Sequence, residues 1–441
     1  MRRLRRTAGL LTFITLSSTA LLGGADDVLA APLLKSSSAS ESLAAVKFFR
    51  TDKTLKRKRL VTIDLAVLEQ EILPAAARLS PDRASLSQKR KGELTLDLFK
   101  DAAITLKNSR VEAALNGGVV WSAEGGGNNF GILVVNGGRV TGYVEKDGHT
   151  YLLEPVGNSG LHRVREVDSN AYPNDIHLDV AAAGKGGGKK GGGGGGSSGG
   201  GGTTTPPPSG TVLQVNLLAA YTARANTLLG GIPGDKIALD VAIVNTGYVN
   251  SGVPLHLNLV GVTAVSSGYD EKAYSDYAQP LYDLTSGTSY NFPAIRDMRN
   301  TLAADLVTMY ADRNEYCGIA WVGGSASYAF SAINPACNGT ATLAHELGHN
   351  MALHHDRYVE AAASANVYNY GYVNTTGKFR TIMSYNNACS AVGVSCARVT
   401  YYSTPKLLYN GYPLGIPQGT AGAADATRKL GENATAVSGF R

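Results

Sequence analysis

Apolar and polar positions in residues 211–441 follow two alternating patterns. Three short apolar runs have the length and composition of buried strands. They are residues 212–221, 255–265 and 318–322. Between these runs, residues 235–245 and 295–313 repeat apolar positions at steps of three and four, which predicts helices. Strands that alternate with helices are typical of an α/β fold with a mostly parallel sheet, and this is the fold expected here.

The upstream region, residues 31–183, has a different pattern. Two charged, amphipathic stretches, residues 60–79 and 94–106, predict helices. Four short alternating segments follow, and Asn136-Gly137-Gly138 and Lys146-Asp147-Gly148 between them have the residue types of hairpin turns. The four segments are residues 119–121, 131–135, 140–144 and 151–153. This region is therefore expected to be a small α+β domain with an antiparallel meander.

Composition separates these two regions from each other and from the N-terminus. Residues 184–210 consist almost entirely of Gly, Ser, Thr, Pro and Lys, which predicts a flexible linker with no apolar side chain to anchor it. Residues 1–30 join a basic start to an apolar stretch at 10–22 and end in small residues before a cut expected after Ala30. This layout is typical of a secretory signal peptide, and it is too short and too interrupted for a membrane span. The expected domain order is signal peptide, residues 31–183, linker and residues 211–441.

The net charge of +6 first suggests a nucleic-acid partner. Residues 211–441, however, contain fourteen basic and fifteen acidic side chains, so the excess positive charge lies upstream and in the linker. A nucleic-acid-binding protein needs its positive charge clustered on a folded surface. Nucleic-acid binding is therefore disfavoured, and no stable membrane anchor is expected.

Half of the eight histidines lie within eleven residues, and this cluster carries the strongest chemical signal. His345 and His349 are four residues apart, so a helix places both imidazoles on one face, where they can bind one Zn²⁺ at about 2.1 Å. Glu346 would then lie beside the metal and could take a proton from a water molecule. An isolated His-Glu-x-x-His can also be a solvated helix face. A third ligand, His355, requires the chain to turn after the helix, and three His leave one metal position open for catalysis.

The stretch from His345 to Asp356 resembles the long zinc-binding motif of the metzincin metallopeptidases, and the Asp after the third His resembles the adamalysin (reprolysin) branch. Metzincins usually have Gly where this chain has Ala352. If the backbone takes a positive φ there, Ala costs about 1 kcal/mol relative to Gly. The departure leaves open whether His354 or Asp356 replaces His355 as a ligand.

A second feature of the resemblance lies downstream. Met383, in Thr381-Ile382-Met383-Ser384-Tyr385, follows His355 by 28 residues, as the metzincin Met-turn would; alone, it would be read as a core Met. Tyr385 occupies the position where the astacin and serralysin branches carry a Tyr near the zinc, so the resemblance implies a hydroxyl that stabilises an oxyanion. No residue pattern supports a structural calcium ion.

The four cysteines, Cys317, Cys337, Cys389 and Cys396, allow three pairings, of which the local pairs Cys317–Cys337 and Cys389–Cys396 are favoured in an oxidising compartment. An upstream domain on a cleavable linker suggests a prodomain that acts as an intramolecular inhibitor. It contains no Cys to occupy the zinc. Asp175 could do so as in the astacin branch, although an ordinary loop acid is the simpler interpretation.

The leading hypothesis is a secreted zinc endopeptidase that is made as a zymogen and acts on proteins or peptides. One Zn²⁺ would be held by His345, His349 and His355, with Glu346 as general base. Two rivals remain: a catalytically inactive binding or adhesion module on the same fold, and a zinc hydrolase of cell-wall peptides. Localisation is expected to be extracellular or periplasmic.

Overall fold

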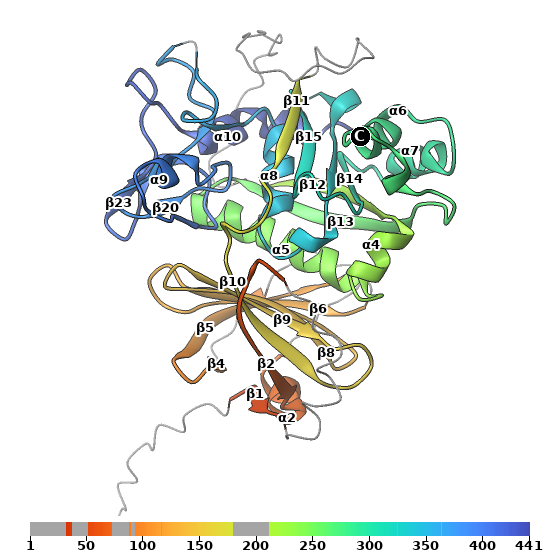
Figure 1. The fold of residues 1–441 in the computed structure, drawn as a ribbon, viewed down its shortest axis with the longest axis vertical. Helices are drawn as coiled ribbons and strands as arrows, with labels where there is room; N and C mark the ends of the chain where they lie inside the picture. Colours follow the sequence, from red (N-terminus) through yellow and green to blue (C-terminus); the bar gives the residue numbers. More distant parts are fainter. Residues whose placement is uncertain are drawn as a thin grey trace, which may run out of the picture.

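The computed structural model describes residues 32–37, 52–72, 88–89, 93–115, 117–179, 211–323, 325–362 and 364–441. The expected signal peptide and the glycine-rich linker lie outside these residues. Figure 1 shows two β-sheets, one built from the N-terminal residues and one from the C-terminal residues. We refer to residues 32–167 as the N-terminal unit, residues 168–179 as the crossing segment and residues 211–441 as the C-terminal unit. No helix among the described residues is long and apolar enough to cross a membrane.

The N-terminal unit is built on a sheet whose pairings are all antiparallel. Its hairpins turn where the sequence predicted: Gly137 and Gly138 have φ of 54° and 82°, and Asp147 and Gly148 have 52° and 76°. Two central residues with positive φ match the twist of a two-residue hairpin. The strands are β1 (Leu34–Ser36), β2 (Leu55–Ile63), β3 (Gln88–Lys89), β4 (Leu94–Phe99), β5 (Ala102–Ala113), β6 (Val119–Glu124), β7 (Phe130–Asn136), β8 (Arg139–Lys146), β9 (His149–Pro155) and β10 (His162–Val167).

The helix expected at 94–106 is wrong, and the one expected at 60–79 is confirmed only at residues 65–71, since residues 73–79 lie outside the described part of the chain. Residues 94–106 lie in the hairpin of β4 and β5, because buried and less buried side chains alternate along residues 94–99 and 102–106, which is the strand period of two. Residues 60–63 complete β2, and only α2 (Leu65–Glu71) is helical; Asp64 caps its first turn by accepting from the amides of Ala66 and Val67. The charged side chains between the apolar ones had suggested a helical face.

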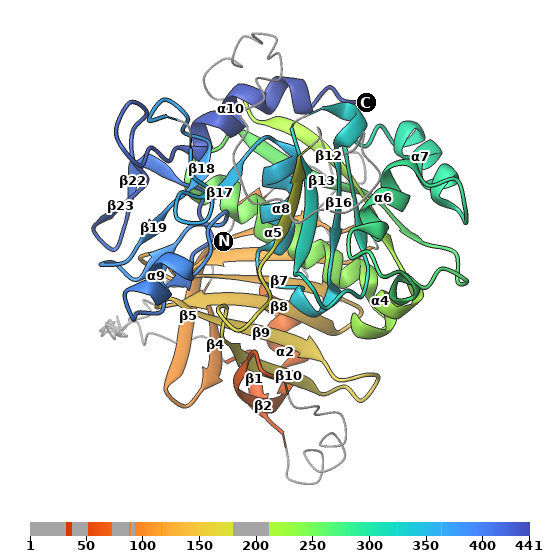
Figure 2. The ribbon, with the colours of Figure 1, turned by 45° about the horizontal axis from the view of Figure 1, so that its top comes forward.

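The C-terminal unit places helices on both faces of a second sheet of mixed direction. Four of its five pairings are parallel, and only β15 runs antiparallel to its neighbour β16. The strand order is β11 (Ile176–Asp179), β15 (Gly318–Val322), β16 (Phe330–Ile333), β14 (Leu306–Tyr310), β12 (Leu213–Tyr221) and β13 (Leu255–Ala264). The outermost strand, β11, belongs to the crossing segment and therefore comes from the chain before the linker (Figure 2).

Two helices, α5 (Pro233–Ser251) and α8 (Thr342–Asn350), share one hydrophobic core with one face of this sheet. The other face packs against α6 (Gln279–Ser286) and α7 (Phe292–Thr301). The remaining helices are α4 (Ala223–Leu228), α9 (Asn387–Ala391) and α10 (Ala426–Val437). The small strands are β17 (His354–Asp356), β18 (Tyr370–Gly371), β19 (Val373–Asn374), β20 (Phe379–Arg380), β21 (Ala397–Arg398), β22 (Thr404–Tyr409) and β23 (Tyr412–Leu414).

The helix expected at 235–245 is present as part of α5, whereas the one expected at 295–313 is only partly correct. The helix α7 ends at Thr301, Ala303 takes a positive φ of 46°, and residues 306–310 form the fully buried strand β14. A strand that is buried on both faces is apolar at every position, so its sequence cannot be distinguished by period from a buried helix.

The N-terminal sheet packs against α5. Ile132 and Tyr143 belong to the same hydrophobic core as α5 and α8. At the start of α5, Lys236 pairs with Glu154 at 3.0 Å, and Asp235 pairs with Arg139 at 3.2 Å. The Lys236–Glu154 pair is largely buried, whereas Arg139 is 42% exposed, so the interface combines apolar packing with ion pairs of different burial.

A further polar contact in this interface is made by the buried carboxyl group of Glu145. Glu145 Oε2 accepts hydrogen bonds from Thr400 Oγ1 at 2.8 Å and Tyr143 Oη at 3.1 Å. Among the described residues its other oxygen, Oε1, has no hydrogen-bond partner. Burial raises the pKa of Glu145 to about 7, although the hydrogen bonds from Thr400 and Tyr143 act to lower it.

We predict a pH-dependent stability that depends on Glu145. Because its folded pKa lies above the ordinary value of 4.5, the folded protein binds a proton more tightly than the unfolded chain. The stabilisation is full below about pH 4.5 and is lost as the pH rises through about 7, a cost of about 3 kcal/mol. Urea unfolding of wild type and Glu145→Gln should therefore agree at pH 4.5 and diverge by pH 8, with the variant more stable. Glu124→Gln, on an exposed strand position, is the matched control, and parallel pH profiles for wild type and Glu145→Gln would contradict the prediction.

Candidate active site

The helix α8 and the chain that follows it bring three histidines together. His345 and His349 lie one turn apart on α8, and their Nε2 atoms are 3.0 Å apart. His355, on β17, places its Nε2 3.1 Å from that of His349. All three side chains are buried. The three nitrogens therefore converge on one point, as a metal with three imidazole ligands requires.

The turn between α8 and β17 makes this convergence possible. Ala352 adopts a left-handed backbone with φ of 67°, and the amide of Leu353 donates back to the carbonyl of Gly348 at 2.9 Å. This is a helix C-terminus closed by a left-handed residue, a position at which Gly is usual. The backbone at Ala352 therefore does take a positive φ, although the Cβ of Ala makes this conformation less favourable than it is for Gly.

The two residues that might have replaced His355 have other partners. His354 Nδ1 lies 3.1 Å from Glu360 Oε2, and its ring stacks on Tyr370. The Asp356 carboxylate accepts from the backbone amides of Tyr358 at 3.0 Å and Tyr385 at 2.9 Å. Asp356 thus links the third histidine to the segment after Met383, and its oxygens are directed away from the cluster of imidazoles.

Hydrogen bonds orient two of the imidazoles. His345 Nδ1 lies 2.9 Å from the carbonyl of Ile382, and His349 Nδ1 lies 2.8 Å from that of Leu353. Donation from Nδ1 leaves Nε2 with a free lone pair, which is the tautomer a metal needs. Burial lowers the pKa of His345 and His349, so both rings are neutral, again the form that binds metal. The third ring contacts Glu360 through its own Nδ1.

Glu346 is buried beside this cluster with no hydrogen-bond partner for either carboxylate oxygen among the described residues. Its side chain lies so close to the edge strand β15 that a Cβ at Gly318 would collide with Oε1. Burial, and then the charge of Asp175, raises the pKa of Glu346 well above its ordinary value. An unpartnered buried carboxyl group is costly, and such groups occur where a bound water, ion or substrate completes the site. The donor set of three imidazoles with this carboxyl group fits a catalytic metal.

Met383 and Tyr385 both lie at this cluster. Met383 is fully buried beneath α8, where a Cβ at Gly348 would collide with its Sδ, and the amide of Ser384 closes a turn by donating to Thr381. The Tyr385 hydroxyl is 2.8 Å from His355 Nε2. The structure thus brings the two residues of the expected Met-turn segment against the histidines.

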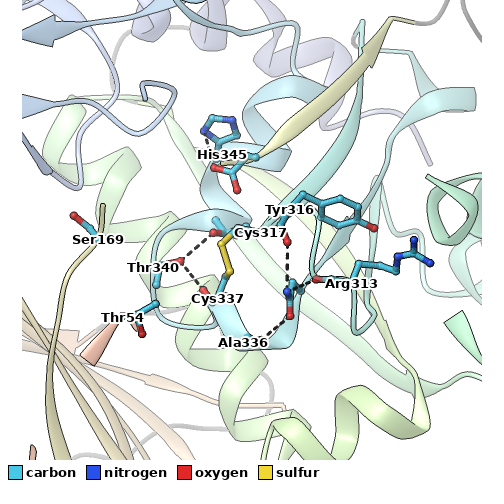
Figure 3. Close-up of a disulfide and its surroundings, with 12 residues drawn as sticks. Thr54, Ser169, Arg313, Tyr316, Cys317, Ala336, Cys337, Thr340 and His345 are labelled. Atoms are coloured by element: carbon cyan, nitrogen blue, oxygen red, sulfur yellow. Dashed lines mark hydrogen bonds and ion pairs between the residues drawn. A yellow bond between two sulfur atoms is a disulfide. The ribbon is translucent and has the colours of Figure 1, made fainter. Parts of the chain in front are cut away.

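Both local disulfides are present. Cys317 is bonded to Cys337 with their Cα atoms 5.5 Å apart, and Cys389 to Cys396 with 6.0 Å. Figure 3 shows that the first bond lies near His345. Because Cys317 directly precedes β15 and Cys337 precedes α8, this disulfide ties the start of the strand to the loop that leads into the helix.

The crossing segment occupies the space in front of the histidines. β11 pairs in parallel with β15, and the amide of Cys317 donates to the carbonyl of Asn174 at 3.3 Å. The ring of His177 lies 4.9 Å from that of His349 and 4.7 Å from that of His355. His177, His349 and His355 have ligand atoms close enough to share one metal ion. No sequence pattern points to His177, because an isolated His 168 residues before His345 has no spacing that links it to a metal.

Asp175, which the sequence did single out, is buried in this contact. Its carbonyl accepts a hydrogen bond from the Tyr385 hydroxyl. Its carboxylate oxygen Oδ2 accepts from Arg398 Nη2 at 2.9 Å and lies 3.6 Å from His345 Nδ1. No sequence pattern points to Arg398, since it lies 43 residues after His355. The pairing of β20 with β21 brings it to the site.

Comparisons with known proteins agree with this geometry. A model of the reprolysin-like metallopeptidases of family M12B matches residues 235–356. A peptidyl-Asp metalloendopeptidase of Stenotrophomonas maltophilia is 32% identical over 409 residues, which cover 87% of this chain and 89% of that protein. One of Xanthomonas campestris is 28% identical over 424 residues, covering 91% and 95%. Among solved structures, metalloproteinase-II of Bacteroides fragilis covers 65% of this chain and 86% of its own, with 10% identity and a TM-score of 0.38, too low to support an argument.

The chain therefore belongs to the reprolysin-like metallopeptidases. It is a metalloendopeptidase with mixed α/β content in its catalytic part.

We predict that Ala352→Gly stabilises the protein. Glycine takes the left-handed conformation without a Cβ penalty, so the variant should gain up to about 1 kcal/mol in the free energy of unfolding. Ala436→Gly is the matched control: Ala436 is exposed within α10, and the same replacement there should cost about 1 kcal/mol. Urea unfolding of both variants measures the two changes, and a loss of stability in Ala352→Gly would show that the turn is not strained by Ala.

Proposed function

We propose that the protein is a secreted zinc endopeptidase that is synthesised as an inactive precursor. The observation that carries this proposal is the convergence of three buried imidazoles beside a buried carboxyl group that has no partner among the described residues. Three nitrogen ligands with one open position are typical of catalytic zinc. The signal-like residues 1–30 support export.

Each side chain of the site can have a separate role in peptide hydrolysis. His345, His349 and His355 would hold Zn²⁺, which when bound polarises a carbonyl and makes water a better nucleophile near neutral pH. Glu346 is placed to accept the proton of the attacking water at its carboxylate and to return it to the leaving amine. Burial raises the pKa of Glu346 above its ordinary value, the direction that helps a carboxyl group to hold and then return a proton.

Tyr385 supplies a hydrogen-bond donor next to the histidines. In the precursor its hydroxyl donates to the backbone carbonyl of Asp175, which lies in the cleft. A substrate carbonyl in the same place would receive this bond, and the bond would strengthen as negative charge develops on the oxygen. Met383 has no polar role in this scheme; it supports the floor of the site under Gly348.

The relatives from Stenotrophomonas and Xanthomonas are named for action at peptidyl-Asp bonds. We extend this preference for aspartate to the present chain. The two rival functions are less well supported: a binding module has no use for an unpartnered buried Glu346, and no relative reported above is named for cell-wall peptides.

The N-terminal unit would act as an intramolecular inhibitor. The crossing segment adds β11 to the free edge of β15 and brings Asp175 and His177 against the histidines. An extended substrate would use that same edge, since the unpaired strand offers backbone donors and acceptors. Substrate and crossing segment therefore compete for one site, and activation requires that the segment leave.

We predict that Glu346→Gln lowers kcat on casein by about 10²–10⁴-fold, because the variant cannot accept a proton but keeps the shape of the side chain. Metal content, measured by plasma mass spectrometry on the purified protein, should remain at one zinc per chain. Removal of the metal with a chelator should abolish activity, and added Zn²⁺ should restore it. Full activity of Glu346→Gln on casein would disprove the assigned mechanism.

We predict that the active species begins between residues 184 and 212. The linker has no apolar side chain and contains Lys185, Lys189 and Lys190, so proteases should cut there faster than within the folded units. N-terminal sequencing of active enzyme from culture supernatant measures the start. A fully active protein that begins near Ala31 would show that the N-terminal unit is a permanent part of the enzyme.

A further inference from the structure

Arg398 lies directly against the histidine cluster, with its Nη2 2.7 Å from His345 Nδ1. Its Nε and Nη2 donate to the carbonyl of Ile382, the residue before Met383, at 3.0 and 2.7 Å. Its side chain is largely buried, with 10% exposed. A guanidinium fixed in this way loses little entropy when it binds a ligand, so the remaining donors form a preorganised site for a carboxylate.

A second guanidinium lies next to Arg398. Arg380 and Arg398 are paired residues on β20 and β21, and Arg380 is buried. Its Nη1 donates to the carbonyl of Ser384 at 2.6 Å, and its Nη2 donates to the carbonyl of Ser169 in the crossing segment at 3.2 Å. Two neighbouring buried cations repel each other, so this corner of the cleft favours an anion.

In the precursor that anion is Asp175. Its side chain is 4% exposed, Oδ2 accepts from Arg398, and the second oxygen, Oδ1, has no partner among the described residues. A small cavity borders this contact and is lined by Asp175, Arg380, Tyr385, Asn386 and Arg398 among other residues. The backbone carbonyl of the same aspartate accepts from Tyr385. One residue therefore presents its carbonyl to the catalytic hydroxyl and its side chain to Arg398.

We infer that Arg398, assisted by Arg380, is the specificity determinant that recognises an acidic side chain next to the cleaved bond, and that Asp175 occupies this subsite in the precursor as a substrate mimic. This inference rests on the proposed function. When the crossing segment leaves, Arg398 loses its only carboxylate partner among the described residues. A substrate aspartate restores the ion pair, whereas asparagine, with the same shape and no charge, does not.

The first test compares two otherwise identical fluorogenic peptides, one with Asp and one with Asn, on mature wild type, Arg398→Gln and Arg398→Lys. In wild type, kcat/KM should favour Asp. In Arg398→Gln the value for the Asp peptide should fall by about ten- to a hundredfold, while that for the Asn peptide stays within a few fold. Arg398→Lys, which keeps the charge without the fork of donors, should lie between the two. Arg428→Gln, on the surface of α10, is the matched control and should match wild type.

Each outcome of this test is decisive. An unchanged ratio of Asp to Asn cleavage in Arg398→Gln, or an equal loss for both peptides, would overturn the inference, because Arg398 would then act only by supporting Ile382 and His345. Zinc content, measured alongside, reports whether that support is intact. If the wild type cleaves neither peptide nor casein, the proposed function is wrong instead. The contact between Asp175 and Arg398 is then tested separately, in the precursor, by the binding experiment below.

The second test uses the full-length precursor carrying Glu346→Gln, nicked in the linker with trypsin so that the N-terminal unit can dissociate. Adding Asp175→Asn removes the charge from the subsite, so the dissociation constant of the nicked complex should rise by about ten- to a hundredfold. Asp179→Asn, an exposed position at the end of β11, is the matched control and should leave it unchanged. Equal dissociation constants for the Asp175→Asn and Asp179→Asn proteins would show that Asp175 does not occupy a carboxylate site.

Discussion

The reversal of the chain after α8 is the constraint on which the active site depends. A helix can present His345 and His349 on one face, but a continuing helix would carry the third imidazole to another face. The left-handed Ala352 ends α8 and turns the chain so that His355 meets the other two. The same turn exposes the carbonyl of Leu353, which orients His349. One backbone conformation thus brings the three candidate metal ligands together and orients one of them, His349.

The second requirement is a support that keeps the imidazoles from relaxing apart. Met383 fills the space beneath Gly348, where α8 has no side chain, and the carbonyl of Ile382 contacts both His345 and Arg398. Asp356 binds the amide of Tyr385 and so fixes this segment to the third histidine. Segments far apart in the chain therefore support one another at the site, and the Cys317–Cys337 disulfide ties the start of β15 to the loop before α8.

The crossing segment supplies the partner that allows a charged group to be buried at the site. Asp175 lies with Arg398, and β11 supplies hydrogen-bond partners to β15 along an otherwise free edge. An unpaired strand edge invites pairing with other chains, and the hydrogen bonds of β11 cover this edge of β15. The contact between the two units also includes the buried Glu145, which accepts a hydrogen bond from Thr400, so the interface extends well beyond the crossing segment.

The sequence by itself determined the features that depend on short, regular spacing. The period of α8, the positions of its histidines and Glu346, the Met383 segment and the glycine-rich hairpin turns each follow from residues close together in the chain. The spacing of apolar residues predicts the wrong element in two places. The strand β14 is buried on both faces, so its sequence resembles the end of the helix α7. In the hairpin of β4 and β5, charged residues between the apolar ones resemble the polar face of a helix. Only the tertiary structure decided that His177 and Asp175 lie in the cleft and that Arg398 faces them. The reason is physical: these contacts are made between segments far apart in sequence, and their geometry is set by how whole strands pair, β11 with β15 and β20 with β21, which no local pattern encodes.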